Sequence, residues 1–462
     1  MQTRNLRWRA TSPTVTEGVF LLEVSSLGTG LSTDGELAPR DEAILLLQLA
    51  AEIEHALMVQ YLYAAFSLEV DQSAMRGPTV PPDAAIKTAE WRSRILRIAK
   101  QEMGHLVTVQ NLLRAIGAPL HFGREDFPFS ASSFYPFKFT LEPVTRDVLA
   151  KFVAAERPEQ PDRTILPEAK EAEILKRAKA DAGSDINRVG ALYSRLIDVF
   201  GDFAADGTIF LGDTETLQAS PDSEEWTGSS GGDRVLVRNF TGTPALMQTQ
   251  ATSALREIAE QGEGIVADDP ERTSAHFRVF LDLYDAFPEN PAHGGTWVPS
   301  RPVPVNPAIA GEADASLADS ISEPDSRKLA HLANVRYRML LLYLQHTLRT
   351  PATSDLRSTL FGWAFKEMQM IALLGAGLTK QPRTAGKPAT EVAAAICFDM
   401  PYMIALPERD SDCWRVHRDL LDANDALLGS VAPAVLSAID SAGRLKSLTA
   451  VRRPTVNHQL GL

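Results

Sequence analysis

The chain has 462 residues, of which 44% are hydrophobic and 23% charged, and its formal net charge is −13. This composition is that of a globular protein long enough for one large core or for two or three domains. The negative charge argues against binding to nucleic acid or to anionic membranes, and no run of about 18 apolar residues predicts a membrane span. Two cysteines and an N-terminus without an apolar leader favour a cytoplasmic protein.

Residues 1–37 are expected to form an N-terminal extension, with a short strand at 18–24 followed by a loop. A long helix should then run from about residue 42 to 70, with Asp41 as its N-cap. It is apolar nearly all round, which predicts a buried helix. Glu54 is the expected inward carboxylate because Tyr61 lies seven residues on, on the same face. A phenol there can hydrogen-bond another carboxylate of a metal site. The alternative is a surface glutamate and an ordinary core tyrosine.

The segment from Trp91 to Leu113 has apolar residues at helical spacing. Glu102 and His105 interrupt its apolar face three residues apart, so both side chains can reach one point. Four-helix carboxylate proteins use Glu-x-x-His to hold iron or manganese, although any exposed helix can carry this pattern by chance. A Pro- and Gly-rich linker at 71–83 predicts an antiparallel hairpin that places Glu54 opposite Glu102 and His105.

Residues 120–145 are rich in phenylalanine and proline. They predict either a long loop packed on the helices or a lid or wall for an apolar or aromatic substrate. Short helices are expected at about 145–156, where Thr145 is the cap, and at 167–182. A third amphipathic helix should cover 186–203, and it contains no glutamate. A strand is expected at 234–238.

A fourth helix should begin at Pro244 and end at 262–264. Glu260 and Glu263 form another pair three residues apart, and His276 lies in the first turn of the next helix. Three helical regions and the His276 segment therefore carry carboxylates or histidines on otherwise apolar faces. Buried ionisable groups are costly unless they converge on a metal or on each other, so the pattern predicts a metal site.

Residues 291–324 have no periodicity and predict a linker or crossing loop. Accessory helices packed on the bundle are expected in 325–462, two of them at about 325–348 and 354–378. We expect Glu367 to be solvated or close to a helix cap, and His331 and His346 to be structural. The basic tail from Arg444 is expected to be mobile.

Three segments together resemble the ferritin-like domain of the iminophenyl-pyruvate dimer synthase type, found in bisindole biosynthesis. They are LAAEIEHALMVQYLYAAFSL, AKQEMGHLVTVQNLLRAIGAPL, and IAEQGEG followed by SAHFRVF. Looser similarity continues through 189–197, 334–348 and 384–389. The resemblance implies a mainly α fold in which residues 38–290 form a ferritin-like four-helix bundle with insertions, long loops and an iron site.

Carried over to this chain, the resemblance makes Glu54 the ligand of the first helix and Glu102 and His105 those of the second. It assigns Glu263, with Glu260 as a companion, to the fourth helix and His276 to the segment after it. A glutamate is expected after the glycine of the third helix, but Ala191 stands there. The departure puts a symmetric di-iron site in doubt and leaves a mononuclear or asymmetric site open.

These observations predict a non-haem iron oxidoreductase with one or two ions, or manganese in their place, and with Tyr61 in a catalytic role. The resemblance implies that dioxygen or peroxide would oxidise or couple a small amino-acid-derived imine or amine. The pigment enzymes are much longer, so their reaction is not expected to transfer whole. The alternatives are a zinc or metal-free coupling protein, and a ferritin-like metal-binding or scaffold protein without redox turnover. The expected partner is an apolar or aromatic small molecule, and a homodimer is left open.

Overall fold

The computed structural model describes residues 38–129, 135–202, 209–211, 215–220, 235, 237–263, 275–309, 320–400 and 404–462. Within these ranges the protein is almost entirely helical, with twelve α-helices and one two-stranded sheet. The strand expected at 18–24 lies outside the described residues, as do Arg234 and Leu236 of the strand expected at 234–238.

The longest two helices form the antiparallel hairpin that the sequence predicts. Helix α2 spans Pro39–Ser67 and α3 spans Ala84–Ala115, and the linker between them contains a single 3-10 turn, η2, at Gln72–Ala74. Pro39 occupies the first turn of α2, so the helix begins two residues before the expected N-cap, and Asp41 lies inside its first turn. An acidic group there is favourable to the positive end of the helix dipole.

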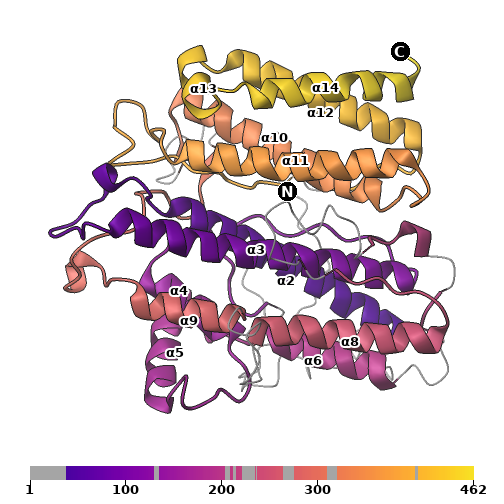
Figure 1. Cartoon of the computed structure of the whole chain (residues 1–462), viewed down its shortest axis with the longest axis horizontal. Helices are drawn as coiled ribbons and strands as arrows, with labels where there is room; N and C mark the ends of the chain where they lie inside the picture. Colours follow the sequence, from indigo (N-terminus) through magenta and orange to yellow (C-terminus); the bar gives the residue numbers. More distant parts are fainter. Residues whose placement is uncertain are drawn as a thin grey trace.

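Five further helices lie below this hairpin in Figure 1: α4 (Arg146–Glu156), α5 (Glu168–Ala182), α6 (Val189–Asp202), α8 (Pro244–Glu263) and α9 (His276–Ala286). Helix α6 packs on both α2 and α8, and α8 also contacts α3, so α2, α3, α6 and α8 close a four-helix bundle. Helices α4 and α9 pack on each other beside this bundle. The side chain of Thr145 caps α4 as predicted, accepting a hydrogen bond from the backbone N–H of Val148.

The C-terminal helices form a separate layer on the other side of α2 and α3 (Figure 1). They are α10 (Pro324–Thr347), α11 (Asp355–Leu378), α12 (Asp410–Ser430), α13 (Pro433–Ile439) and α14 (Arg444–Leu460). Gly375 lets α11 approach α2 closely, because a Cβ at this position would lie 2.6 Å from the Phe66 ring. The short parallel strands β1 (Ala308–Ile309) and β2 (Ser320–Ile321) precede this layer.

Two expectations for the C-terminal third are wrong. Glu367 is fully buried rather than solvated, because the guanidinium groups of Arg336 and Arg452 bind its carboxylate. The tail from Arg444 is not mobile: it forms α14, and Arg452 is buried against α11. Charged residues were interpreted as surface residues, but charges that neutralise each other can be buried. His346 is buried as expected of a structural histidine, whereas His331 is exposed.

The aromatic rings of the 120–145 segment pack into the core. Among the described residues of this segment, five rings are buried and several contact one another. None of the five lines the cavity described below. The described part of the segment therefore fits the interpretation as a loop packed on the helices. The buried rings are those of Phe122, Phe129, Tyr135, Phe137 and Phe139.

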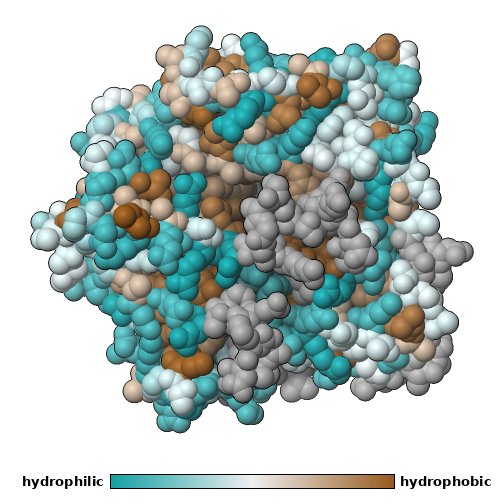
Figure 2. Space-filling view, viewed as in Figure 1, coloured by the Kyte–Doolittle hydropathy of each residue, from teal (hydrophilic) through white to brown (hydrophobic). Residues whose placement is uncertain are grey.

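The surface is largely hydrophilic, with hydrophobic residues in separate patches on the face that Figure 2 shows. In the described ranges, the large hydrophobic side chains that remain exposed are scattered along the chain. No helix in the part of the chain that the structure describes is long and apolar enough to cross a membrane.

Candidate metal centre

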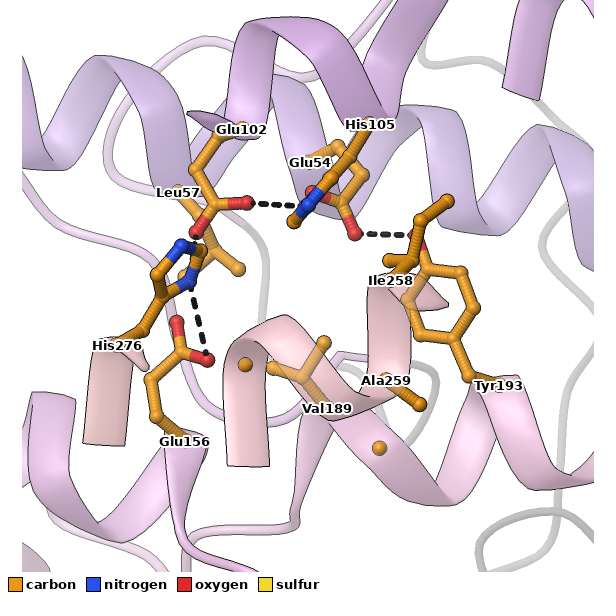
Figure 3. Close-up of a pocket in the computed structure, with 12 residues that line it drawn as sticks. Glu54, Leu57, Glu102, His105, Glu156, Val189, Tyr193, Ile258, Ala259 and His276 are labelled. Carbon is orange, nitrogen blue, oxygen red and sulfur yellow. Dashed lines mark hydrogen bonds and ion pairs between the residues drawn. The ribbon is translucent and has the colours of Figure 1, made fainter. Parts of the chain in front are cut away.

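A small cavity lies inside the four-helix bundle, at the place where α4 and α9 reach it. It measures about 20 Å³, which leaves room only for species as small as water molecules or bare metal ions. Two glutamates and a histidine reach it from α2 and α3, and a glutamate and a histidine from α4 and α9 (Figure 3). Leu57, Val189, Ile258 and Ala259 form its apolar wall. Five ionisable groups thus meet in an otherwise apolar interior.

The first group of ligand atoms comes from the α2–α3 hairpin. Nδ1 of His105 lies 3.2 Å from Oε2 of Glu54 and 2.9 Å from Oε2 of Glu102. All three side chains are buried, with at most 2% of each exposed. The hairpin therefore places Glu54 opposite Glu102 and His105, as its sequence predicts.

The second group uses the other oxygen of Glu102. Nδ1 of His276 lies 3.0 Å from Oε1 of Glu102 and 3.7 Å from Oε2 of Glu156. Glu156 is the last residue of α4, and His276 is the first residue of α9. The structure thus holds two clusters of three potential metal ligands, and Glu102 belongs to both.

The hydrogen bonding inside the clusters is incomplete. Oε1 of Glu102 is buried and has no hydrogen-bond partner among the described residues, although Nδ1 of His276 is close. Nδ1 of His105 faces two carboxylate oxygens at once, and a single N–H cannot donate well to both. Unpaired buried polar atoms are costly, whereas a cation between these atoms would satisfy them. The residues present therefore fit a metal ion.

Glutamine side chains orient both histidines. Nε2 of His105 lies 2.7 Å from Oε1 of Gln261, and Nε2 of His276 lies 3.2 Å from Oε1 of Gln101. An amide oxygen only accepts, so each Nε2 carries the proton and donates it. If a metal ion is bound, a neutral imidazole in this tautomer would present the lone pair of Nδ1 to the ion. Ligating histidines commonly donate their second N–H in this way.

Two buried tyrosines hold the outer carboxylates. The hydroxyl of Tyr61 donates to Oε1 of Glu156 at 2.5 Å, and the hydroxyl of Tyr193 donates to Oε1 of Glu54. Burial, followed by the negative charge of the neighbouring glutamate, raises the pKa of each phenol well above its usual value. Both tyrosines therefore stay protonated and act as donors at neutral pH.

The charges of the cluster are strongly coupled. Burial and then the charge of Glu102 raise the pKa of Glu54 to about 8. Burial disfavours the charged form of Glu102 too, but the neighbouring His276 and His105 outweigh it and lower its pKa. For His276, burial lowers the pKa, but the carboxylate of Glu102 outweighs it and raises the pKa to about 9. Such perturbed groups in one cavity mark a functional site.

The structure brings together most of the residues singled out in the sequence. Glu54, Glu102, His105 and His276 line the cavity, and Tyr61 contacts it through Glu156. Glu260 does not line the cavity and is exposed. Ile258 and Gly262 lie on the face of α8 that lines the cavity, and Glu260 lies on another face. The side chain of Glu263 lies outside the described residues.

Two residues of the site were not anticipated. Glu156 ends a short helix, where a carboxylate faces the negative end of the helix dipole. A glutamate at the C-terminal end of a helix is unfavourable unless a hydrogen-bond donor or a cation binds it. Its position in the sequence could therefore have indicated Glu156 as a candidate ligand. Tyr193 lies in α6, two residues after Ala191, where the resemblance led us to expect a glutamate. The third helix of the bundle thus contributes a phenol rather than a carboxylate.

The match to known proteins agrees with this architecture. The family model described as Ferritin-like matches residues 47–285, which is just over half of the chain. The chain belongs to the Ferritin-like family. Its fold is a mainly α, ferritin-like four-helix bundle with additional C-terminal helices and long loops, as the sequence predicts.

Two relatives are of the dimer-synthase type that the sequence resembles. One is the dichlorochromopyrrolate synthase of Lentzea aerocolonigenes, 26% identical over 74% of this chain and 34% of its own length. The other is the 2-imino-3-(indol-3-yl)propanoate dimerase of Chromobacterium violaceum, 26% identical over 74% of this chain and 33% of its own length. The chain thus spans about a third of the length of each relative.

Among solved structures, a ferritin-like protein from Caulobacter vibrioides is similar, with 16% identity and a TM-score of 0.41. The similarity covers 73% of this chain and 96% of that protein.

Proposed function

We propose that this Ferritin-like chain binds two iron ions and uses them to oxidise or oxidatively couple a small aromatic imine or amine derived from an amino acid. The observation that carries the proposal is the position of Glu102 in both ligand clusters. A carboxylate that belongs to both clusters would help to hold an ion in each of them. Paired carboxylate–histidine sites of this kind bind iron or manganese in four-helix bundles.

The residues divide into two sets that share Glu102. Glu54 and His105 would hold one ion, and Glu156 and His276 the other. Imidazole and carboxylate ligands suit Fe(II) and Mn(II), and the carboxylates balance the positive charge of the ions. When bound, the ions would supply electron transfer to and from dioxygen or peroxide. The resemblance led us to expect a glutamate where Ala191 stands in the third helix. Each ion would nevertheless have a carboxylate of its own, because Glu54 belongs to one cluster and Glu156 to the other.

The chain's own groups keep these ligands in place. Gln261 and Gln101 fix the histidine tautomers, and Tyr193 and Tyr61 hold the outer carboxylates. Burial excludes bulk water, which strengthens every one of these interactions. We propose that Tyr61 acts by holding the carboxylate of Glu156 through its protonated hydroxyl, and that it does not contact the substrate directly.

The organic substrate does not fit beside the ligands, because the cavity is only about 20 Å³. We therefore place it outside this cavity. Joining two imine molecules through a new C–C bond removes two electrons and two protons. Dioxygen can take these up to form hydrogen peroxide, or hydrogen peroxide can take them up to form two waters. The names of the two relatives, a synthase and a dimerase, support this class of reaction, and the name of the dimerase supports an indole-bearing substrate.

The proposal is tested by supplying the iron-loaded chain with 2-imino-3-(indol-3-yl)propanoate. Oxygen or peroxide consumption and the mass of the products are measured, with the Glu102→Ala variant as the control. We expect consumption that depends on the imine and is lost in the variant. If iron binds but neither this imine nor its phenyl analogue drives consumption, the chain is a metal-binding protein without redox turnover.

A further inference from the structure

A second cavity, of about 200 Å³, lies between the chain that follows α2 and the end of α11 in the C-terminal layer. Its walls come from the chain just after α2, from the segment 298–302, and from the end of α11 with the loop after it. It is remote from the metal centre: Glu54 and Ser67 are 13 residues apart on α2, which corresponds to about 20 Å along the helix.

Hydrogen bonds join the walls of this cavity to one another. Backbone hydrogen bonds join the chain after α2 to the 298–302 segment, including one from Glu69 to Pro299 at 2.9 Å. The carboxylate of Glu69 accepts hydrogen bonds from Arg301 and from the backbone N–H of Val70 and Asp71. Arg301 also donates to the carbonyl of Thr379 at the end of α11. Glu69 and Arg301 therefore neutralise each other.

Two further cations lie in the wall, and each has a carboxylate only at longer range: Glu69 for Arg76 and Asp71 for Lys380. Arg76 donates to the carbonyl of Ser300 at 2.6 Å, and Lys380 is exposed at the rim. Neither forms an ion pair with any residue that the structure describes. The remaining carboxylate of the wall, Asp71, directs Oδ1 to the backbone and hydroxyl of Ser73.

Arg92 adds to the positive potential near the cavity. Its Nε is buried and has no hydrogen-bond partner among the described residues. Burial and then the charge of Arg301 lower the pKa of Arg92, so the two guanidinium groups repel each other. This concentration of positive charge occurs in a chain whose formal net charge is −13. The wall and its surroundings thus hold four cations, Arg76, Arg92, Arg301 and Lys380, against the two carboxylates of Glu69 and Asp71. An excess of positive charge around a cavity attracts anions.

We propose that this cavity binds a small organic oxyanion, a molecule bearing a carboxylate or a phosphate group, between Arg76 and Lys380. A cavity of about 200 Å³ has the volume of roughly six or seven water molecules, which suits such a molecule better than a bare ion. Arginine and lysine are the residues that hold carboxylates and phosphates by charge-assisted hydrogen bonds. The proposal does not depend on the proposed function of the metal centre.

The test is calorimetric titration of the full chain with succinate and with inorganic phosphate, in chloride buffer of matched ionic strength. We expect saturable binding of one or both anions. The double variant Arg76→Gln/Lys380→Gln should bind about tenfold more weakly or worse, because two charge-assisted contacts are lost. Succinate binding alone identifies a carboxylate ligand, and phosphate binding alone identifies a phosphate ligand.

The matched control is Arg415→Gln/Arg418→Gln, which removes the same charge from the exposed face of α12. It should bind like the unmodified chain, as should Glu102→Ala, which alters the metal centre. Two results would overturn the proposal: no saturable binding of either anion, or equal weakening in the two double variants.

Discussion

Oε1 of Glu102 lies 3.0 Å from Nδ1 of His276, yet this buried oxygen has no hydrogen-bond partner among the described residues. The two residues come from α3 and α9, which also contact each other through the ion pair of Arg94 with Asp282. Their ligand atoms face the same small space, as two ligands of one ion would. Because Oε2 of the same carboxylate faces His105, Glu102 links the two halves of the centre.

Glu156 tests the half of the site that the sequence did not predict. Glu156→Gln should lower iron content, because the amide removes the negative charge while leaving an oxygen to accept from Tyr61. The measurement is iron per chain by elemental analysis. Glu159→Gln is the control, since Glu159 is exposed and its side chain lies 3.6 Å from Arg188, away from the cavity. Equal iron in the two variants would exclude Glu156 as a ligand.

The glutamines test the orientation of the histidines. Gln101→Leu should weaken metal binding by about 10- to 100-fold, because the Nε2–H of His276 loses its acceptor and the ring is no longer held in one tautomer. Competition with a chelator of known affinity measures the change. Gln101→Glu restores an acceptor and should recover binding. If Gln101→Leu binds metal normally, Gln101 has no positioning role.

Much of the fold follows from local sequence patterns. The α2–α3 hairpin, the bounds of α4 and α5, and the meeting of Glu54 with Glu102 and His105 depend on helical periodicity and a short linker. Such features are encoded within a few turns of the chain. The approach of His276 to Glu102 depends on how α9 packs in three dimensions, and periodicity carries no information about that.

The errors have the same origin. Glu367 and the segment after Arg444 are polar, and polarity alone predicts solvent exposure. In the structure, the carboxylate of Glu367 forms ion pairs with both Arg336 and Arg452, which come from helices more than 30 residues away on either side. Glu260 was predicted as a companion of Glu263 because the two form a pair three residues apart; the structure places Glu260 on the exposed face of α8, while Ile258, Ala259 and Gly262 line the cavity. Burial by a distant partner cannot be deduced from the local sequence.

The buried charges around Glu367 make a stability prediction. Glu367→Leu should lower the free energy of unfolding by about 3–5 kcal/mol, because it leaves two buried guanidinium groups without a counter-charge. Denaturant unfolding followed by circular dichroism measures it. Iron content at low denaturant should be unchanged, since α11 contributes no residue to the metal cavity. A decrease in the free energy of unfolding of less than about 1 kcal/mol would mean that Arg336 and Arg452 do not need the charge of Glu367 to remain buried.

The histidine pair of the C-terminal layer predicts acid sensitivity. His346 donates from Nε2 to Asp410 and accepts at Nδ1 from His417, both at 2.9 Å. Burial, followed by the charge of His346, lowers the pKa of His417 to about 3. An unfolded histidine titrates near pH 6.5, so between about pH 6.5 and 3 the unfolded chain binds a proton that the folded chain excludes. Stability should therefore fall as the pH falls.

The expected contribution of His417 is about 1.4 kcal/mol per pH unit within this window. His417→Phe, which removes the titrating group, should show a shallower loss of stability between pH 6.5 and 4.5 than the unmodified chain. Denaturant unfolding at a series of pH values gives the two slopes. Identical slopes would show that His417 is not kept neutral by the fold.

The most direct test of the account is iron per chain, measured by elemental analysis on protein produced with iron supplied. The unmodified chain, Glu102→Ala and Glu260→Ala are compared, the last as a control because Glu260 is exposed and outside the cavity. We predict close to two irons per chain in the unmodified protein and in Glu260→Ala, and close to none in Glu102→Ala. Two irons retained in Glu102→Ala, or none in the unmodified chain, would contradict a centre bridged by Glu102.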